Sequence, residues 1–369
     1  DVHGSQDLKP EQTTTVELGA DLHFLDNRLN LDFTWYKSNS RDQIFDVPIS
    51  NATGFNRTIT NAGEIENKGI EIQLEARPVE MQDFAWDVGV NYSRNRGTVV
   101  EVAEGIEQIL IGESFGYVGG GASIRLIEGE PFGNIYGQSY LRYYEDGPPE
   151  NQVYLDEDRP LVIGDNGFPV INTNQLVVGN SQPDWISSIR NSFSYRNVNL
   201  SFLIDAKWGQ DVYSQYDNFF TAFGITKNTL DREDFRVFEG VTADGQPNTQ
   251  EVWLGQGLVD PDDPDSRDYG AGYHRNIKRS STEEFVKDAS YIKLRNIRLA
   301  YALPAEIVSR WGFRNITLSA TATNIILYTP FKGFDPESRA GGASSNANGF
   351  TALDYPGVSG LSFSVNLSL

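Results

Sequence analysis

The sequence predicts an all-β fold, a transmembrane antiparallel β-barrel with long extracellular loops. Apolar and polar residues alternate over many segments with the period of two that a strand requires when its two faces meet different environments. Each segment is roughly ten residues long, which is enough for a tilted strand to cross the hydrocarbon core of a bilayer. The connections between segments are of two kinds, short and long, as expected for the two ends of an outer-membrane barrel.

The C-terminal segment, Ser359–Leu369, shows the alternation most clearly. Its apolar residues are separated by single Ser or Asn residues, the pattern that lipid on one side and a polar lumen on the other demand. Similar alternation, broken by Leu203 and weaker in two segments, predicts about eleven strands. In chain order these are Val16–Phe24, Leu29–Tyr36, Ile70–Arg77, Phe84–Ser93, Ala122–Glu128, Asn134–Tyr144, Trp185–Tyr195, Val198–Trp208, Asp288–Leu303, Ile316–Asn324 and Ser359–Leu369.

Two of these strands rest on a parity argument. Antiparallel order requires an even number of strands between Phe84–Tyr92 and Trp185–Tyr195. Asn134–Tyr144 was the obvious candidate, and Ala122–Glu128 completes the pair through a tight Gly129–Gly133 turn. Single-chain bacterial barrels have even strand counts, and an open edge in lipid leaves backbone groups unpaired, so an odd total predicts that this chain does not close a barrel by itself. We therefore expect residues 1–369 to be one domain that forms part of a larger barrel.

Composition narrows the function classes. The net charge of −21 and the pI near 4.5 argue against nucleic-acid binding, which needs a basic surface. The chain has no cysteine, so disulfides and thiolate metal sites are excluded. It also has no run of 18 apolar residues, so no transmembrane helix is predicted.

The largest connection, Tyr213–Lys287, is rich in aromatic residues, with a short helix expected around Leu230–Phe238. A loop of this length must pack on something or bind something. Its rings could contact a substrate or a partner, or they could form the core of the loop itself. With one ring from an earlier loop, the candidate contact residues are Tyr117, Tyr213, Tyr216, Phe219, Phe220, Phe223, Trp253, Tyr269 and Tyr273.

The same connection contains a cluster of acidic residues that could bind a structural calcium ion, which prefers six to eight oxygen ligands. Pro261 and Pro264 break the spacing of an EF-hand loop, so a solvated acidic loop is the competing interpretation. No other cofactor is expected. The candidate ligands are Asp260, Asp262, Asp263 and Asp265.

No enzyme activity is expected. A Ser-His-Asp arrangement would have to use one of three histidines, and His23, on the polar face of a strand, has no nucleophile-elbow motif nearby. Glu71 and Glu75 could suggest a glycosidase pair, but on a lumen wall they are more simply water-facing residues.

Several stretches resemble the SusC/RagA family of TonB-dependent outer-membrane transporters. They follow the order of the family's motifs and span nearly the whole chain. They are Leu8–Gly19, Asn61–Glu71, Asp288–Leu299, Thr323–Asn324, Gly333–Glu337 and Tyr355–Pro356. One departure is Leu369, where family members commonly end in an aromatic residue.

The resemblance implies the C-terminal part of a 22-strand barrel in the outer membrane of a Gram-negative bacterium, with no plug domain in this chain. It implies import of oligosaccharides or peptides beneath a SusD-like surface lipoprotein. It further implies that TonB and its inner-membrane motor act through an N-terminal region, and that two transporter complexes can form a dimer. The alternative from another class is a structural or adhesive β-protein of the cell surface without transport activity.

Overall fold

The computed structural model describes residues 2–4, 7–48, 52, 54–102, 105–114, 121–255, 272–333, 335–340, 348–351 and 355–369. Strands predominate and the helices are short. In this part of the chain, no helix combines the length and the apolar character needed to cross a membrane.

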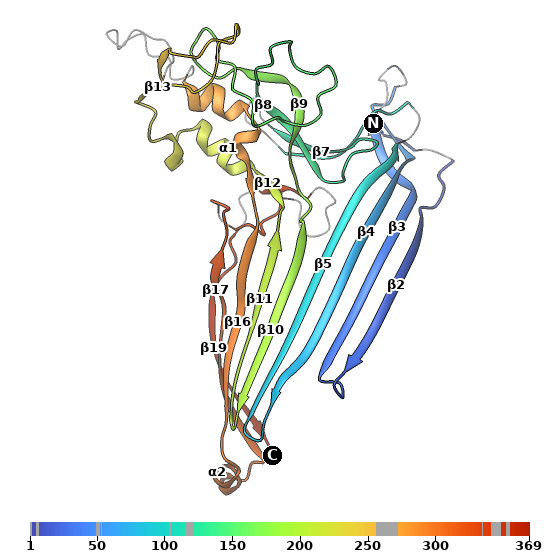
Figure 1. Ribbon diagram of the computed structural model, residues 1–369, viewed down its shortest axis with the longest axis vertical. Coiled ribbons are helices and arrows are strands. Elements are labelled where there is room, and N and C mark those ends of the chain that lie inside the picture. The colour runs from blue at the N-terminus through green and yellow to red at the C-terminus, as the bar shows by residue number, and fades with distance from the viewer. Residues whose placement is uncertain are drawn as a thin grey trace.

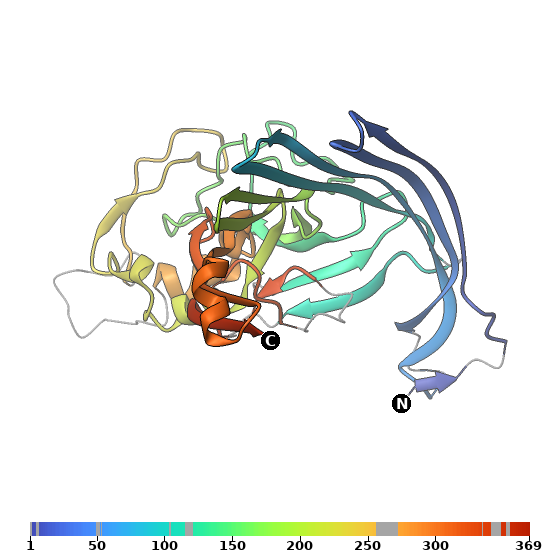
Figure 2. The same ribbon diagram turned by 90° about the horizontal axis from the view of Figure 1, so that it is seen from below.

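The largest sheet in the described residues has ten strands, nine of which follow one another in antiparallel order (Figure 1). The tenth, β1 (Val2–Gly4), pairs in parallel with the start of β4. Viewed from below, the sheet is an open arc, with β2 and β19 as its edges (Figure 2). The nine are β2 (Gln12–Phe24), β3 (Leu29–Pro48), β4 (Arg57–Glu80), β5 (Phe84–Val102), β10 (Trp185–Tyr195), β11 (Val198–Trp208), β16 (Tyr291–Ala302), β17 (Asn315–Tyr328) and β19 (Gly360–Ser368).

The register of this sheet separates apolar from polar side chains. Cross-strand partners lie on the same face, so a row of partners shows what that face presents. One row consists of Trp86, Phe193, Leu200, Leu299, Ala320 and Phe363. The adjacent row on the opposite face consists of Asp87, Ser192, Ser201, Arg298, Thr321 and Ser362.

The apolar face is not covered by a second protein layer at the positions that the sequence singled out. Phe363 is 77% exposed and Leu361 is 68% exposed, and Leu299, within the sheet, is 53% exposed. The all-β class and the antiparallel barrel architecture are therefore confirmed, although this sheet does not close into a ring.

Asn191 explains why alternation is weak in β10. It lies in the apolar rows, opposite Val88 and Phe202, yet it is buried. Trp86 donates a hydrogen bond from Nε1 to Oδ1 of Asn191 at 3.1 Å. The indole N–H and the amide oxygen thus satisfy one another on the apolar face.

Tight turns join the strands at the end of the sheet where α2 and the C-terminus lie (Figure 1). Between β2 and β3, residues Leu25, Asp26 and Asn27 all have positive φ, and Arg196 adopts φ 50° in the two-residue connection between β10 and β11. Positive φ values of this kind let the chain reverse direction within a few residues. The three longest connections, after β5, β11 and β17, leave from the other end. The connection from β3 to β4, predicted to be long, has eight residues (49–56), fewer than the twelve (303–314) between β16 and β17.

The assignment of Ala122–Glu128 and Asn134–Tyr144 to the barrel is wrong. β5 pairs directly with β10, which leaves no place for two strands between them. The two segments form β7 (Ala122–Leu126) and β8 (Asn134–Tyr140) of a separate four-stranded sheet with β6 (Ile109–Ser114) and β9 (Ile171–Asn180). Residues of β7 and β8 are almost all buried, so their apolar content reflects a protein core and not a lipid-facing side. Nine barrel strands result instead of about eleven, and the number remains odd.

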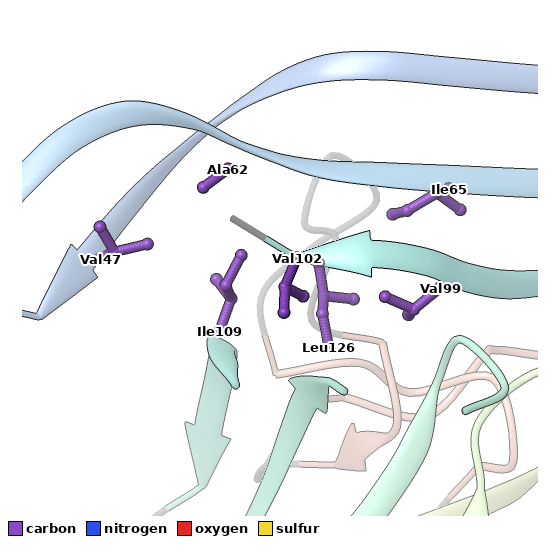
Figure 3. Packing of buried hydrophobic residues seen from close by; sticks show 7 residues of the cluster. All are labelled: Val47, Ala62, Ile65, Val99, Val102, Ile109 and Leu126. Carbon is purple, nitrogen blue, oxygen red and sulfur yellow. The ribbon is translucent and has the colours of Figure 1, made fainter. Parts of the chain in front are cut away.

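Strands β3, β4 and β5 extend beyond the length that a bilayer requires, at 20, 24 and 19 residues. Their far ends pack against β6 and β7 through a cluster of buried aliphatic residues (Figure 3). This cluster fixes the four-stranded sheet to the barrel sheet. It consists of Val47, Ala62, Ile65, Val99, Val102, Ile109 and Leu126.

Most of the remaining elements belong to the long connections and form small sheets and short helices. β12 (Asp211–Ser214) lies between β15 (Val286–Asp288) and β18 (Phe350–Thr351), and β13 (Phe235–Val237) pairs with β14 (Glu251–Trp253). The helical elements are α1 (Gln215–Ala222), η2 (Lys227–Thr229), η4 (Tyr273–Ile277), η5 (Lys278–Ser280) and η6 (Glu283–Phe285), with α2 (Ala305–Val308) and η7 (Ser309–Trp311) in the short connection after β16.

Candidate functional site

A network of charged side chains lies where β11 and β16 meet the connection after β17. Arg295 donates hydrogen bonds from Nε and Nη2 to Oδ2 of Asp205, at 3.0 and 2.6 Å, and from Nη1 to Oε2 of Glu337, at 2.8 Å. Lys293 donates to Oδ1 of Asp335 at 2.9 Å and also pairs with Glu337. The arginine fork therefore joins a carboxylate of the barrel wall to a carboxylate of the connection.

Further hydrogen bonds extend the network. The Tyr291 hydroxyl donates to Oε1 of Glu337 at 2.7 Å, and the Gly357 amide donates to Oδ2 of Asp335 at 3.0 Å. Three segments that carry the family resemblance, Asp288–Leu299, Gly333–Glu337 and Tyr355–Pro356, are thus brought together at one place. The sequence showed these segments as separate motifs and gave no sign that they contact each other.

The network strongly favours charged carboxylates in the connection after β17. Burial of the Glu337 carboxyl would raise its pKa, but hydrogen bonds from Arg295, Lys293 and Tyr291 outweigh burial and lower the pKa to about 2. Burial also opposes the charged form of Asp335, yet Lys293 and the backbone amides of Glu337 and Gly357 keep the pKa of its carboxyl below the ordinary value. Both acids remain ionised at neutral pH.

Two adjoining cavities lie along the polar face beside this network and share Ser93 and Ile186. One, of 520 Å³, is lined by acidic and amide side chains that include Asp32, Glu71 and Asn91. The other, of 230 Å³, offers donors from Lys207, Arg339, Asn95, Gln182 and Gln210. The wall therefore presents acceptors and donors in succession to a polar solute.

Three of the aromatic residues predicted to contact a ligand are buried in the loop region. Tyr213 has no exposed surface and packs with Phe285. Trp253 stacks on Phe235 at 6.0 Å between ring centroids, and Tyr273 shares a hydrogen bond of 3.0 Å with the Tyr140 hydroxyl. Burial raises the pKa of the Tyr213 and Tyr273 hydroxyls. These rings build the cores of the long connections.

The other four described rings lie on or just after α1. Tyr216 and Phe220 are one helical turn apart and line a groove of 1140 Å³ at the end of β15 and after the end of β17. Phe219 and Phe223 are partly exposed, with ring centroids 4.8 Å apart. Among the described members of the aromatic set, these four are the ones accessible to a ligand or partner.

The helix expected around Leu230–Phe238 is wrong. That segment contains turns followed by β13, and the helix is α1, Gln215–Ala222. Asp231, Asp234 and Arg236 make turn and ion-pair contacts that compete with helical hydrogen bonds. The remaining candidates lie outside the described residues. They are Tyr117, Tyr269, Asp260, Asp262, Asp263 and Asp265.

The described residues contain no group of three or more His, Cys, Asp or Glu side chains arranged to hold a metal ion. His23 lies between Asn30, 2.8 Å from Nδ1, and Asp21, 3.1 Å from Nε2, while Glu75 pairs with Arg190. His23 and Glu75 thus make hydrogen bonds and ion pairs with neighbouring polar residues of the barrel sheet.

The groove beside α1 also gathers Lys227, Lys278, Lys287 and Lys332. Sequence reasoning missed this set because its members are far apart along the chain and no local motif connects them. A sparse signal existed, since the chain has only nine lysines and three of these four border the largest aromatic connection or lie within it.

Comparison with known proteins identifies the architecture. Residues 2–117 match the sequence model of the family described as "TonB dependent receptor-like, beta-barrel". The chain is 27% identical over 373 residues to TonB-dependent receptor P3 of Formosa agariphila, covering 98% of this chain and 34% of that protein. It is 23% identical over 344 residues to TonB-dependent receptor SusC of Bacteroides thetaiotaomicron, covering 91% and 30%.

The fold is similar to a solved structure of the RagAB peptide importer in the open-open state, with a TM-score of 0.66 at 17% identity, over 98% of this chain and 35% of that chain. The closed-closed state gives 0.65 at 18% identity. The chain spans about a third of the length of the curated relatives it matches. Over nearly its whole length the chain is therefore similar to the C-terminal third of TonB-dependent receptors, and residues 2–117 match the β-barrel model of that family.

Proposed function

We propose that this chain forms part of the wall of a TonB-dependent importer in the outer membrane of a Gram-negative bacterium, with its long connections on the extracellular side. The observation that carries the proposal is the division of six neighbouring strands, from β5 to β19, into one apolar and one polar face. Such a wall suits acyl chains on one side and a hydrated passage on the other.

The cargo that we propose is an oligosaccharide or a peptide, moved without covalent chemistry by residues of this chain. The polar face supports a solute of this kind, because its cavities alternate carboxylate and amide acceptors with guanidinium, ammonium and amide donors. Hydroxyl and peptide groups can exchange hydrogen bonds with both kinds.

The full-length protein would supply the other parts of the machine. β2 and β19 are the edges of the sheet in the described residues, and unpaired backbone groups in lipid cost several kcal/mol each. Further strands of the same barrel would pair with these edges around a plug domain. TonB and its inner-membrane motor would act through the N-terminal region of the full-length receptor.

A SusD-like surface lipoprotein is the proposed extracellular partner, and two such complexes would form a dimer. The relationship to SusC supports the lipoprotein partner. The arrangement of the connections supports it as well, because the long ones leave the sheet together at one end and offer a broad surface there (Figure 1).

An uptake experiment tests the proposal. Cells that express the full-length receptor are given fluorescently labelled oligosaccharides and peptides, and internal label is separated from surface label by protease and quencher treatment. We expect receptor-dependent accumulation that disappears in a strain without TonB while surface binding persists. Surface binding alone, unaffected by TonB, would instead support an adhesive protein.

A further inference from the structure

The groove beside α1 is large and is built from segments far apart in the sequence. Its volume of 1140 Å³ exceeds that of most small-molecule pockets, so it can take several linked units. Its walls come from α1, from η2 and η5, from the end of β15 and from the residues that follow β17.

The charge of this groove is opposite to that of the chain. Four of the nine lysines line it, together with only two carboxylates, Asp217 and Asp288, which gives a formal charge of +4 − 2 = +2. The whole chain carries −21. A cationic recess in an acidic protein concentrates anions from the surrounding water.

Two of the lysines remain available to an incoming anion. Lys227 and Lys332 are exposed, and neither forms an ion pair within the part of the chain that the structure describes. Lys278 lies 3.7 Å from Glu284, and Lys287 donates to the Glu284 carbonyl.

The lysines are close enough to disfavour each other's charge. Burial lowers the pKa of the Lys287 ammonium, and the charges of Lys278 and Lys332 lower it further, while Asp217 and Glu284 oppose the effect. A bound anion would relieve this repulsion.

Aromatic rings form the other part of the wall. Tyr216 and Phe220 are four residues apart, so both project from one side of α1, with ring centroids 6.4 Å apart. Gly333 lies against the Tyr216 hydroxyl, where a Cβ would approach the oxygen to 2.0 Å, so the close fit depends on glycine at this position. Flat rings beside cations suit a ligand that has both an apolar ring face and negative groups.

We propose that this groove binds an anionic saccharide, with the lysines on its carboxylate, sulfate or phosphate groups and the Tyr216 and Phe220 rings against its sugar faces. The ligand is either a soluble oligosaccharide or the phosphorylated headgroup of an outer-membrane glycolipid. Binding at the groove requires neither TonB nor transport, so a test of this binding site can fail or succeed independently of the proposed transport function.

The test uses the full-length receptor purified in detergent and titrated calorimetrically. The soluble probe is hexagalacturonate, and its fully methyl-esterified form is a neutral control of the same length and linkage. The acidic peptide hexaglutamate is the third ligand. The glycolipid probe is lipopolysaccharide, with and without its phosphates, presented to the receptor in nanodiscs.

We expect one anionic saccharide to bind and its neutral counterpart to bind at least about tenfold more weakly, with affinity falling as salt rises. Lys227→Gln with Lys332→Gln should weaken binding on the order of tenfold. The control pair Lys9→Gln with Lys68→Gln removes two exposed lysines that do not line the groove, one before β2 and one on β4, and should change nothing. Phe220→Leu keeps an apolar side chain but removes the ring, and it should weaken saccharide binding.

The two arms identify the source of the ligand. Hexagalacturonate binding that depends on the two lysines indicates a soluble saccharide, and binding only of phosphorylated lipopolysaccharide indicates the membrane glycolipid. The proposal is overturned if neither binds, if the neutral hexamer binds equally well, if the lysine pair has no effect, or if hexaglutamate binds as tightly as the saccharide.

Discussion

Arg295 of β16 donates a hydrogen bond of 2.8 Å from Nη1 to Oε2 of Glu337, and the same guanidinium binds Asp205 of β11. The connection after β17 is thereby fastened to two neighbouring strands of the wall. Lys293 adds a second cation, and its side chain is almost fully buried. Residues 335–340 and 355–357 therefore have a defined position on the polar face.

Replacing Glu337 by Gln should release this connection. The change removes the charge that Arg295 and Lys293 share, and because Glu337 is about one-third exposed we expect a modest loss of about 1–2 kcal/mol. Limited proteolysis of the folded receptor should show faster cleavage between residues 335 and 357. Glu128→Gln, at an exposed turn, is the control, and equal cleavage in both variants would contradict the role given to Glu337.

The stabilising contribution of the contact between Glu337 and Arg295 should be lost at low pH and unaffected at neutral pH. The pKa of Glu337 is about 2 in the folded protein and 4.5 ordinarily, so its stabilising contribution is complete above about pH 4.5 and is lost as the pH falls toward 2. Hydrogen exchange of residues 335–340 should be unchanged from pH 8 to pH 5, after correction for intrinsic rates, and should accelerate below pH 4.5. In Glu337→Gln this acid-induced step should shrink, and a step of full size would show that other groups cause it.

Adjacent residues of β11 should respond in opposite ways to the same substitution. Leu200 lies in the apolar row and Ser201 in the polar row. Lysine on the lipid side costs about 2–4 kcal/mol at the bilayer centre and less toward the edge of the bilayer, and Leu200 lies two residues after the start of β11, whereas lysine on the hydrated side is tolerated. Leu200→Lys should therefore reduce the heat-modifiable folded form on gels and Ser201→Lys should not. Equal tolerance of both would contradict the assignment of the faces.

Gly69 should not tolerate a side chain. A Cβ at this position would lie 2.3 Å from the ring of Tyr36, which crosses the glycine and donates a hydrogen bond to Asn95 at 3.1 Å. Gly69→Ala must displace that ring, at a cost of about 1–3 kcal/mol, and should lower the temperature at which the folded form is lost. At Gly19, in contrast, a Cβ would meet its neighbours at 3.6 Å, so Gly19→Ala should leave that temperature unchanged.

The sequence predicts the barrel strands well because lipid and water impose opposite requirements on alternate residues. Apolar and polar residues alternate clearly in Ser359–Leu369 and Val198–Trp208, and both segments form barrel strands. The error at Ala122–Glu128 and Asn134–Tyr144 has a physical cause. Strands inside a protein core can be apolar on both sides, so composition does not distinguish them from membrane strands. The parity argument required only an even number of barrel strands between β5 and β10, and the actual number, zero, is also even.

The candidate site was predictable only in part. Aromatic content correctly marked the long connection after β11 as a structured region, but it could not separate buried rings such as Tyr213 from rings lining the groove such as Phe220. The lysine groove and the contact between Lys293 and Asp335 depend on which distant segments meet. That information lies in the tertiary arrangement of the connections and not in any local pattern.

The continuity of β3, β4 and β5 has a mechanical consequence. These strands pass without interruption from the barrel wall into the aliphatic cluster around Val99 and Ile109, so any movement of the four-stranded sheet relative to this corner of the wall would break the packing of that cluster. A load applied to that sheet would be transmitted along the strand axes as shear.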